Sequence, residues 1–281
     1  MEMPNQSKRS YESEAEFLAN YRIEAYQQQS ITADVAVFSM VDETVDNHRK
    51  DSKQKLHILL VKRGEHPFLH SWALPGGFMR PHETVEECAL REIREETALT
   101  PSHMFPIGVF SKPDRDPRGR IVSNAFASIQ REPTAVKGGS DAVSAKWFEV
   151  DFRCEPNGTV DLCLTSGDEV LQTRLEIQDC GLFGRKLNTL SDGGLAFDHG
   201  EIIATAMLAM RDAAEDYKIA FDFLPERFTL TALQRVQEIL EGNSLLAANF
   251  RRKIAEFVEE TEEFTEGAGH RPARLYKRKE K

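Results

Sequence analysis

Residues 76–99 read GGFMRPHETVEECALREIREETAL, and they place six glutamates directly behind a pair of glycines. Like charges on neighbouring turns of a helix repel each other by a few tenths of a kcal/mol per pair. Such a face is therefore either only solvated or placed against a positive charge. The spacing of the glutamates favours the second explanation.

Three of the glutamates share one face of the predicted helix. Glu92, Glu95 and Glu96 stand at positions i, i+3 and i+4, whereas Ala89 and Ile93 point toward a core. Carboxylate oxygens grouped in this way are the ligands that hard divalent cations such as Mg²⁺ or Mn²⁺ prefer. The alternative is a charged helix that is only solvated, and this spacing disfavours it.

The residues around this face suit phosphate chemistry. Gly76 and Gly77 allow the backbone to approach closely, and the Gly76 carbonyl can serve as a further ligand. Arg91 can hold a neighbouring carboxylate by a bidentate contact. The chemistry implied is metal-assisted attack of water on a phosphate ester or anhydride, in which the metal neutralises charge on the transferred group.

The order of these residues resembles the Nudix box. The box consists of Gly, five residues, Glu, seven residues and then Arg-Glu-apolar-any-Glu-Glu-any-Gly-apolar, and it begins here at Gly77. One position departs from it, because Ala98 stands where the family has glycine. That glycine ends the helix and takes no part in the chemistry. The matching residues are Gly77, Glu83, Arg91, Glu92, Ile93, Glu95, Glu96 and Leu99.

The resemblance implies an α+β fold, the Nudix α/β/α sandwich, and hydrolysis of a nucleoside diphosphate linked to another group. Two residues of the box, Glu83 and Arg91, would orient the others. Mg²⁺ or Mn²⁺ would be the cofactor. The implied metal ligands are Gly76, Glu92, Glu95 and Glu96, and the implied catalytic set is Glu83, Arg91, Glu92, Glu95 and Glu96.

The general base is left open between two possibilities. Glu92 is one candidate, and the other is a residue outside the box, as in some members of the family. Asp141, in the loop GGSDA, is a candidate for such an outside base, with a turn-forming role as the alternative.

Two other segments resemble the ADP-ribose pyrophosphatase branch of the family and its regulator relatives. They are PFLHSWALPGGF at 67–78 and KPDRDPRGRIVS at 112–123. We expect Arg118 and Arg120 to contact a diphosphate or a ribose, and the alternative is a solvated loop. The expected ligand is a nucleoside diphosphate such as ADP-ribose.

Aromatic residues in the first of these segments are candidates for a base-stacking surface. Phe78 is expected to stack on adenine, and Phe68 and Trp72 are further candidates. Packing in the core is the alternative, and we expect it for at least two of the three.

The last sixty residues predict a second unit. After the linker FDFLPERF, apolar residues at helical spacing predict two short helices, and Gly267 and Gly269 mark the turn between two following strands. This order is typical of a winged helix-turn-helix, whose second helix and wing would contact base edges and phosphates of double-stranded DNA. The candidate DNA-binding residues are Arg251, Arg252, Lys253, Arg271, Arg274 and Lys277.

The distribution of charge also separates this unit from the rest. Residues 222–281 hold eleven basic and eleven acidic side chains, so the net charge of −10 lies entirely before them. Such asymmetry indicates two units with different partners. Because glutamates between residues 259 and 266 would repel a polyanion, the alternative is a module that only supports a dimer.

These patterns predict a division of the chain into an N-terminal helical segment (1–30), a Nudix domain (31–216) and a winged-helix domain (222–281). Within the Nudix domain, residues 152–196 are expected to form a β-hairpin insertion, because TVDLCLT and EVLQTRLEI flank a short SGD turn. The combination resembles Nudix-related transcriptional regulators of NAD metabolism, and a homodimer is expected.

Composition limits the class of protein. No apolar run approaches the roughly 20 residues that span a bilayer, and the N-terminus lacks the apolar core of a signal peptide. We therefore expect a cytoplasmic protein without a membrane partner. The four cysteines show no metal-finger spacing, so reduced thiols are expected.

Two functions remain open and are compatible in one chain. The first is an enzyme that hydrolyses ADP-ribose or a similar dinucleotide, which the intact glutamates favour. The second is a DNA-binding regulator whose Nudix domain senses ADP-ribose or a related NAD metabolite, which the winged helix favours.

Overall fold

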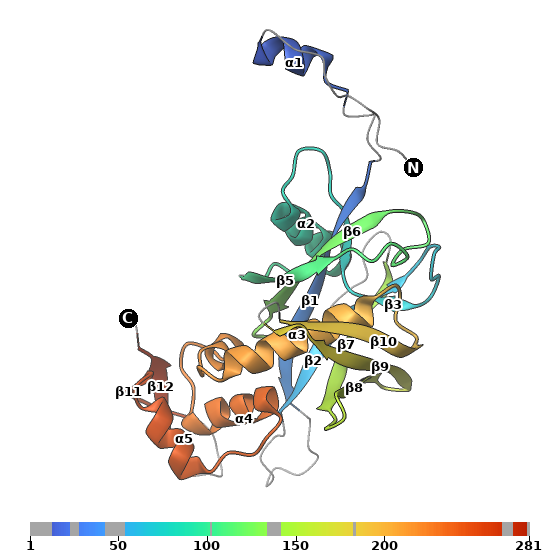
Figure 1. The fold of residues 1–281 in the computed structure, drawn as a ribbon. Helices are drawn as coiled ribbons and strands as arrows, with labels where there is room; N and C mark the ends of the chain where they lie inside the picture. The colour runs from blue at the N-terminus through green and yellow to red at the C-terminus, as the bar shows by residue number, and fades with distance from the viewer. Residues whose placement is uncertain are drawn as a thin grey trace.

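A computed structural model describes residues 13–22, 28–42, 54–101, 103–133, 142–181, 184–265 and 272–279. In the described part of the chain, the strands before residue 194 form one ten-stranded mixed sheet with the order β10-β9-β8-β7-β2-β1-β6-β5, in which β3 pairs with β2 and β4 with β1 (Figure 1). Among the strand pairs of the described residues, β1 and β6 run parallel and the others run antiparallel. The strands are β1 (Ser30–Asp42), β2 (Gln54–Arg63), β3 (Trp72–Ala73), β4 (Gly76–Phe78), β5 (Met104–Phe110), β6 (Ile121–Ile129), β7 (Ala142–Cys154), β8 (Thr159–Ser166), β9 (Glu169–Asp179) and β10 (Arg185–Gly193).

The central strand β1 is buried on both faces, and its alternating side chains enter two separate cores. Val35 and Val37 pack with α2 (Val85–Thr97) on one face. Ala36 and Phe38 pack on the other face with α3 (His199–Ala214). Successive residues of a strand point to opposite sides of the sheet. The result is a layer of helix on each side, which confirms the predicted α/β/α sandwich.

The glutamate helix α2 begins and ends where its local sequence dictates. Thr84 caps its first turn by accepting a hydrogen bond from the Glu87 N–H (3.2 Å), and the Glu87 carboxylate accepts one from the Thr84 N–H (2.8 Å). This is a capping box. At the other end, Ala98 takes the left-handed conformation with φ of 60°. That conformation costs a non-glycine residue about 1–2 kcal/mol, which explains why the Nudix box has glycine there.

Residues 152–196 extend the main sheet. β8 and β9 pair antiparallel up to Ser166 and Glu169, and Gly167 at the turn between them has φ of 59°. β7 joins β8 to the central strands, and β10 closes this end of the sheet. The expected hairpin thus lies in the same layer as the strands of the sandwich, where it packs against α3.

The C-terminal residues form a small unit of helices and two strands, which is the expected winged helix-turn-helix. α4 starts after Thr229, whose side chain accepts a hydrogen bond from Ala232 N–H, and ends at Gly242 with φ of 72°. β11 and β12 pair antiparallel as the wing. The elements are η3 (Ile219–Phe223), α4 (Leu230–Glu241), α5 (Ala247–Ile254), β11 (Val258–Phe264) and β12 (Arg274–Arg278).

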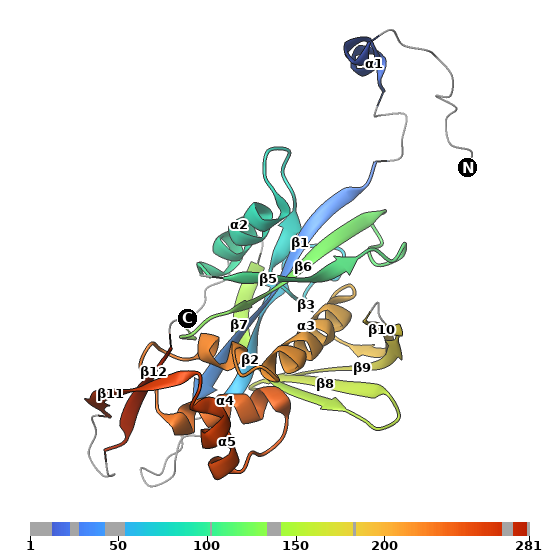
Figure 2. The ribbon, with the colours of Figure 1, turned by 60° about the vertical axis from the view of Figure 1, so that its left-hand side comes forward.

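One hydrophobic core joins this unit to the sandwich. Leu233 and Val236 of α4 and Phe250 of α5 belong to the same buried cluster as Met207 and Met210 of α3. Burial of this shared apolar surface fixes the winged helix against the end of α3. Both ribbon views place the winged helix and α1 at opposite ends of the molecule (Figure 1, Figure 2).

The described residues of the expected N-terminal helical segment (1–30) contain one short helix. α1 spans Glu14–Asn20, and none of its side chains is buried. Both views show it away from the sheet (Figure 1, Figure 2). No helix in the described part of the chain combines the length and the apolar character needed to cross a bilayer.

Candidate functional site

A cavity of about 610 Å³ opens beside the glutamate helix. Its wall combines the α2 glutamates with strands β1 and β4 and with two loops that follow much later in the sequence. A volume of this size lies in the range of small-molecule sites. The charged and titratable residues of its lining include Asp34, Arg63, Arg80, Arg91, Glu92, Glu95, Glu96, Arg115, Asp116, Arg118 and His199.

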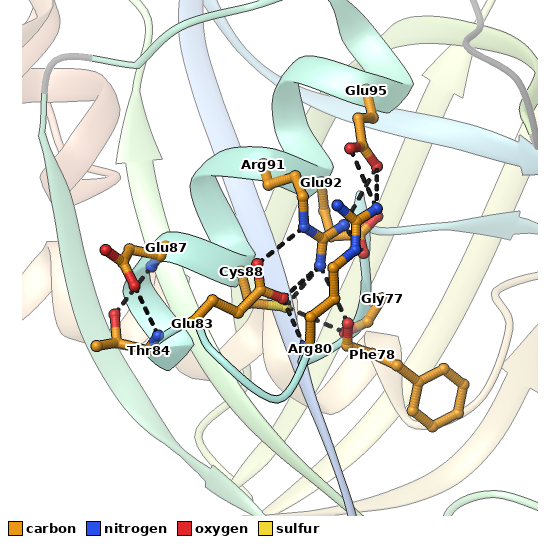
Figure 3. A network of polar contacts seen from close by, with 10 residues as sticks. All are labelled: Gly77, Phe78, Arg80, Glu83, Thr84, Glu87, Cys88, Arg91, Glu92 and Glu95. Carbon is orange, nitrogen blue, oxygen red and sulfur yellow. Dashed lines mark hydrogen bonds and ion pairs between the residues drawn. The ribbon is translucent and has the colours of Figure 1, made fainter.

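Arg91 lies at the centre of the acidic face (Figure 3). Its Nε and Nη2 donate to the two oxygens of Glu83 at 2.9 and 2.6 Å. Its Nη1 donates to Glu92 Oε1 at 2.6 Å and to Glu95 Oε2 at 3.2 Å. The hydrogen bonds from Arg91 hold the pKa of Glu83 at about 2. Arg91 therefore contacts three box glutamates, and it holds Glu83 by a bidentate contact of the kind that the sequence predicts.

A second arginine reaches the same face from the loop before the helix. Arg80 Nη2 lies 3.3 Å from both oxygens of Glu95, and the Arg80 N–H donates to Glu83 Oε1 at 2.7 Å. Two guanidinium groups thus share the carboxylates of one helix face (Figure 3). The charge that this face requires is supplied by the protein itself.

Glu96 lies on the more buried side of the face. Its Oε2 accepts a hydrogen bond from the Gly76 N–H at 3.0 Å. Burial raises the pKa of Glu96 to about 8, and the neighbouring charges of Glu92 and Asp34 act in the same direction. Burial also raises the pKa of Glu92. Burial therefore favours the protonated forms of both carboxylic acids in the inner part of the site.

The double glycine is required by close packing against this helix. A Cβ atom at Gly77 would lie 2.4 Å from Glu92 Oε1, and one at Gly76 would lie 2.4 Å from the Ala33 carbonyl oxygen. Only glycine leaves room for both contacts. These two residues hold the β4 backbone directly beside the carboxylates.

The carboxylates fit a hard divalent cation by their chemistry, but they are arranged around arginine. Among the described residues, no group of three His, Cys, Asp or Glu side chains is positioned to hold a metal ion. Glu92 and Glu95 are turned to Arg91, and Glu96 is turned to the Gly76 N–H. The raised pKa of Glu96 identifies the place where a cation would relieve repulsion, since a nearby positive charge favours the ionised carboxylate.

A buried ionic network lies beneath the glutamates, and the sequence pattern did not predict it. Arg115 binds both oxygens of Asp198 at 2.9 and 2.6 Å and lies 3.6 Å from Asp34 Oδ2. Ser123 donates a short hydrogen bond to the same Asp34 oxygen. Buried charges are normally paired in this way. Arg115 lies in the segment at 112–123, from which the sequence analysis selects Arg118 and Arg120. The abundance of charged residues in this segment is the signal that could have pointed to Arg115.

His199 connects this network to α3. Its Nδ1 accepts a hydrogen bond from the Leu74 N–H at 2.8 Å, so the neutral ring carries its proton on Nε2, which lies 3.7 Å from Asp34 Oδ1. Burial lowers the pKa of His199. Nothing in the sequence around it distinguishes this histidine from any residue at the start of a helix.

Alternating cations and aromatic rings line one side of the cavity. The Arg118 guanidinium lies 4.9 Å from the Phe78 ring centroid and 5.5 Å from that of Phe197. The Arg63 guanidinium lies 4.9 Å from the Phe197 ring centroid, and Phe68 packs edge-on against Phe197 with 4.7 Å between the ring centroids. Phe78 and Arg118, both expected to bind the ligand, are therefore brought together. Phe197 and Arg63 are additions that the sequence pattern did not indicate.

The remaining candidates lie elsewhere. Arg120 donates to the Ser111 carbonyl at 2.6 Å and is not among the cavity-lining residues. Trp72 is buried, packs edge-on against Phe148 and donates to Glu169, so packing explains it. Asp141 and Arg271 fall outside the described residues.

The candidate DNA-binding residues fall into two groups that differ in their partners. Arg251, Arg252 and Lys253 are exposed on α5. On the wing, Arg274 is ion-paired with Glu260 and Lys277 with Glu259. The wing arginine and lysine are thus neutralised across the two strands, whereas the α5 residues have no carboxylate partner in the described part of the chain.

Comparison with known proteins matches both parts of the chain. The NUDIX domain family matches residues 44–161, and the family described as NrtR DNA-binding winged helix domain matches residues 220–277. An ADPR responsive transcriptional repressor, NtrR, from Acinetobacter baylyi is 26% identical over 272 residues, which are 95% of this chain and 89% of that protein.

Two further proteins resemble this chain over different lengths. An ADP-ribose pyrophosphatase from Methanocaldococcus jannaschii is 46% identical over 102 residues, which cover 36% of this chain and 57% of that protein. The crystal structure of Shewanella oneidensis NrtR complexed with a 27mer DNA has a TM-score of 0.56 and 25% identity, with 89% of this chain and 93% of that chain covered. The chain therefore contains a NUDIX domain followed by an NrtR-type winged-helix domain.

Proposed function

We propose that the protein is a DNA-binding transcriptional regulator whose Nudix cavity binds ADP-ribose and thereby changes the affinity for DNA. The observation that carries this proposal is the path of α3. Its first residue, His199, lines the cavity, and Met207 and Met210 share a core with Leu233 of α4 and Phe250 of α5. A ligand that binds one position of α3 better than another would shift the winged helix as well.

The relatives support the two binding activities separately. The Acinetobacter baylyi protein that matches along most of the chain carries the name of an ADPR-responsive repressor. The Shewanella oneidensis protein was crystallised with DNA. Both relatives are similar to this chain over the sandwich and the winged helix together. The similarity therefore supports a function in which both units take part.

The cavity suits ADP-ribose in charge and shape. Arg63 and Arg118 line the cavity and carry positive charge that a diphosphate requires, with Arg118 held by Asp116 at 2.7 Å. Arg side chains bind phosphates through two parallel hydrogen bonds. Phe78 is exposed beside Arg118 and offers a face on which adenine can stack. The carboxylates of α2 line the same cavity and would repel the diphosphate unless a cation lies between them.

The experiment compares DNA binding with and without ADP-ribose. The duplex is first selected from random DNA, and fluorescence anisotropy then measures its dissociation constant in EDTA, so that metal-dependent hydrolysis does not remove the ligand. Arg118→Gln should reduce the effect of ADP-ribose, because Arg118 lines the cavity. Arg120→Gln is the matched control from the same loop and should leave the effect intact. A wild-type protein that selects DNA but ignores ADP-ribose would refute the sensor role.

Hydrolysis of ADP-ribose to AMP and ribose 5-phosphate is the second candidate function, favoured by the complete set of box glutamates. Glu92, Glu95 and Glu96, with the Gly76 carbonyl, would hold Mg²⁺ or Mn²⁺, which neutralises charge on the transferred phosphoryl group when bound. Arg91 would orient Glu92 through the contact at 2.6 Å. Glu92 is the candidate general base within the box, and Asp141 outside it is the alternative.

Hydrolysis is tested by measuring AMP formation with Mg²⁺ present. Glu95→Gln should abolish most of the product, since it removes a ligand charge without disturbing the core. Glu86→Gln changes an exposed glutamate of the same helix that lies outside the cavity and should leave the rate unchanged. A wild-type protein that forms no AMP with Mg²⁺ or Mn²⁺ would refute the hydrolase function, and the sensor function would then remain as the one proposal.

A further inference from the structure

The loop between β5 and β6 contacts the start of α3 at three points, each through one basic side chain of the loop. The three contacts are Arg118 with Phe197, Arg115 with Asp198 and Lys112 with Glu201. Arg118 and Arg115 line the cavity, whereas neither Lys112 nor Glu201 is among its lining residues. The third contact therefore joins the same two segments at a point outside the ligand site.

The Lys112–Glu201 pair is short and largely shielded from water on the carboxylate side. Lys112 Nζ donates to the two Glu201 oxygens at 2.7 and 2.8 Å. The Glu201 side chain is 6% exposed and that of Lys112 is 36% exposed. Glu201 Oε1 also accepts hydrogen bonds from the N–H and the hydroxyl group of Thr189 in β10, at 3.0 and 2.9 Å. One buried carboxylate thus connects the loop, α3 and β10.

Stability alone is a weak reason for such a pair. Desolvation of a buried carboxylate offsets much of the attraction to its partner, and apolar side chains of similar size often stabilise a protein as well or better. An ion pair differs from an apolar contact in that it depends on the exact position of a few atoms. The Lys112–Glu201 pair therefore fixes the position of the loop relative to α3.

The loop is also held together by its own hydrogen bonds. Asp116 is almost fully buried, and its carboxylate accepts hydrogen bonds from the Arg118 N–H, Nε and Nη2 at 2.9, 3.0 and 2.7 Å. The Lys112 carbonyl accepts one from the Arg115 N–H, and the Asp116 carbonyl accepts one from the Gly119 N–H. Because these bonds connect one end of the loop to the other, a displacement of Arg118 also displaces Lys112.

The far side of α3 contacts the winged helix. Glu201 lies in the first turn of α3, and Met207 and Met210 of the same helix share a core with residues of α4 and α5. From Glu201 to Met210 the helix rises by about 14 Å. A hydrogen-bonded helix of this length moves as a unit, so a shift of its first turn reaches the shared core.

We propose that Lys112 and Glu201 are positioning residues that transmit ligand binding in the cavity to the winged helix, an inference that rests on the proposed ADP-ribose-dependent binding of DNA. A ligand bound to Arg118 displaces the loop, and the ion pair displaces α3 with it. The pair contacts neither the ligand nor the DNA. Its loss therefore reduces the coupling between the two sites, while each site keeps its own affinity.

The test measures a coupling factor, which is the ratio of the dissociation constants for the selected duplex with and without saturating ADP-ribose. Fluorescence anisotropy in EDTA gives both constants for the full-length protein. Lys112→Met removes the charge but keeps the length of the side chain, and Glu201→Gln keeps an acceptor for Thr189. Each variant should bring the factor closer to one by at least about two-fold. The affinity for each ligand in the absence of the other should equal that of the wild type.

Two further variants separate coupling from a general loss of stability. Lys112→Arg retains the charge and should retain the coupling. Lys55→Met is the matched control, because Lys55 forms an ion pair of similar length and exposure with Glu149 (2.8 Å) that joins β2 to β7 and not the loop to α3. It should leave the factor unchanged. A thermal unfolding curve shows that each variant is folded, and Lys112→Met, at a partly exposed position, decides the result if Glu201→Gln fails to fold.

The outcomes distinguish this inference from the proposed function on which it rests. A coupling factor of one for the wild type would refute the proposed function itself. A wild-type factor different from one that Lys112→Met leaves unchanged would keep the proposed function and overturn the role of the ion pair. An equal loss of coupling in Lys55→Met would overturn that role as well, because the loss would then not be specific to the contact between the loop and α3.

Discussion

Glu96→Gln should stabilise the metal-free protein at alkaline pH and leave it unchanged at acid pH. The pKa of Glu96 is about 8 in the folded chain, against a reference value of 4.5. Between these values the unfolded chain releases the proton and the folded chain retains it, so the wild type loses stability as pH rises. Each unit of the difference corresponds to about 1.4 kcal/mol, which gives an upper bound of about 5 kcal/mol above pH 8. Glutamine keeps the shape of the protonated acid and avoids this loss.

Urea unfolding in EDTA measures the effect directly. The difference between the midpoints of Glu96→Gln and the wild type should be small near pH 5 and should grow steadily to about pH 8. Glu86→Gln, on the exposed side of the same helix, should show no such trend. Two curves for Glu96→Gln and the wild type that stay parallel from acid to alkaline pH would refute the reasoning, because they would show that Glu96 ionises in the folded protein as easily as in water.

Three other substitutions test separate parts of the structure. Gly77→Ala should abolish hydrolysis and ligand binding while the winged helix stays folded, since its Cβ would lie 2.4 Å from Glu92 Oε1; measured ligand affinity equal to that of the wild type would contradict this. Ala98→Gly should raise the free energy of unfolding by about 0.5–1 kcal/mol, because the φ of 60° favours glycine, and urea titration checks it. Glu260→Gln should tighten DNA binding and steepen its salt dependence by about one phosphate contact, because it frees Arg274; an unchanged slope would exclude the wing from the interface.

Local patterns in the sequence were sufficient to predict the acidic helix and its orientation. Periodicity places Ala89 and Ile93 in the core, where both are fully buried. Thr84 and Glu87 form the capping box that limits the helix. Because these features depend on residues within one or two turns of each other, the sequence alone contains the information. The resemblance of the same residues to the Nudix box predicted the fold class, and the structure confirms this α/β/α sandwich.

The network below the glutamates could not be predicted in the same way. Asp34, Arg115 and Asp198 come from three distant parts of the chain, and only the folded sheet and α3 bring them together. The position of Arg91 among the glutamates is a different case, because its partners lie within eight residues of it in the sequence. The sequence predicts a cation against the acidic face, but it does not show that the guanidinium of Arg91 fills much of that role.

The wing gives a second example of long-range pairing. A sequence count separates basic from acidic residues but does not show that Glu259 and Glu260 face Lys277 and Arg274 across two strands. That the basic residues of the wing contribute to DNA binding stays a prediction. Because they are paired with glutamates, we expect a smaller contribution to DNA affinity from them. The role of α5 is correspondingly larger.

The coupling between the cavity and the winged helix is tested most directly by measuring ADP-ribose affinity with and without the selected duplex. Isothermal titration of the full-length protein in EDTA gives both dissociation constants. Because coupling free energies are reciprocal, DNA must change the affinity for ADP-ribose by the same factor by which ADP-ribose changes the affinity for DNA. We predict two different affinities that are related by that shared factor. Equal affinities in the presence and absence of DNA would contradict the account, since the cavity and the winged helix would then bind their ligands independently.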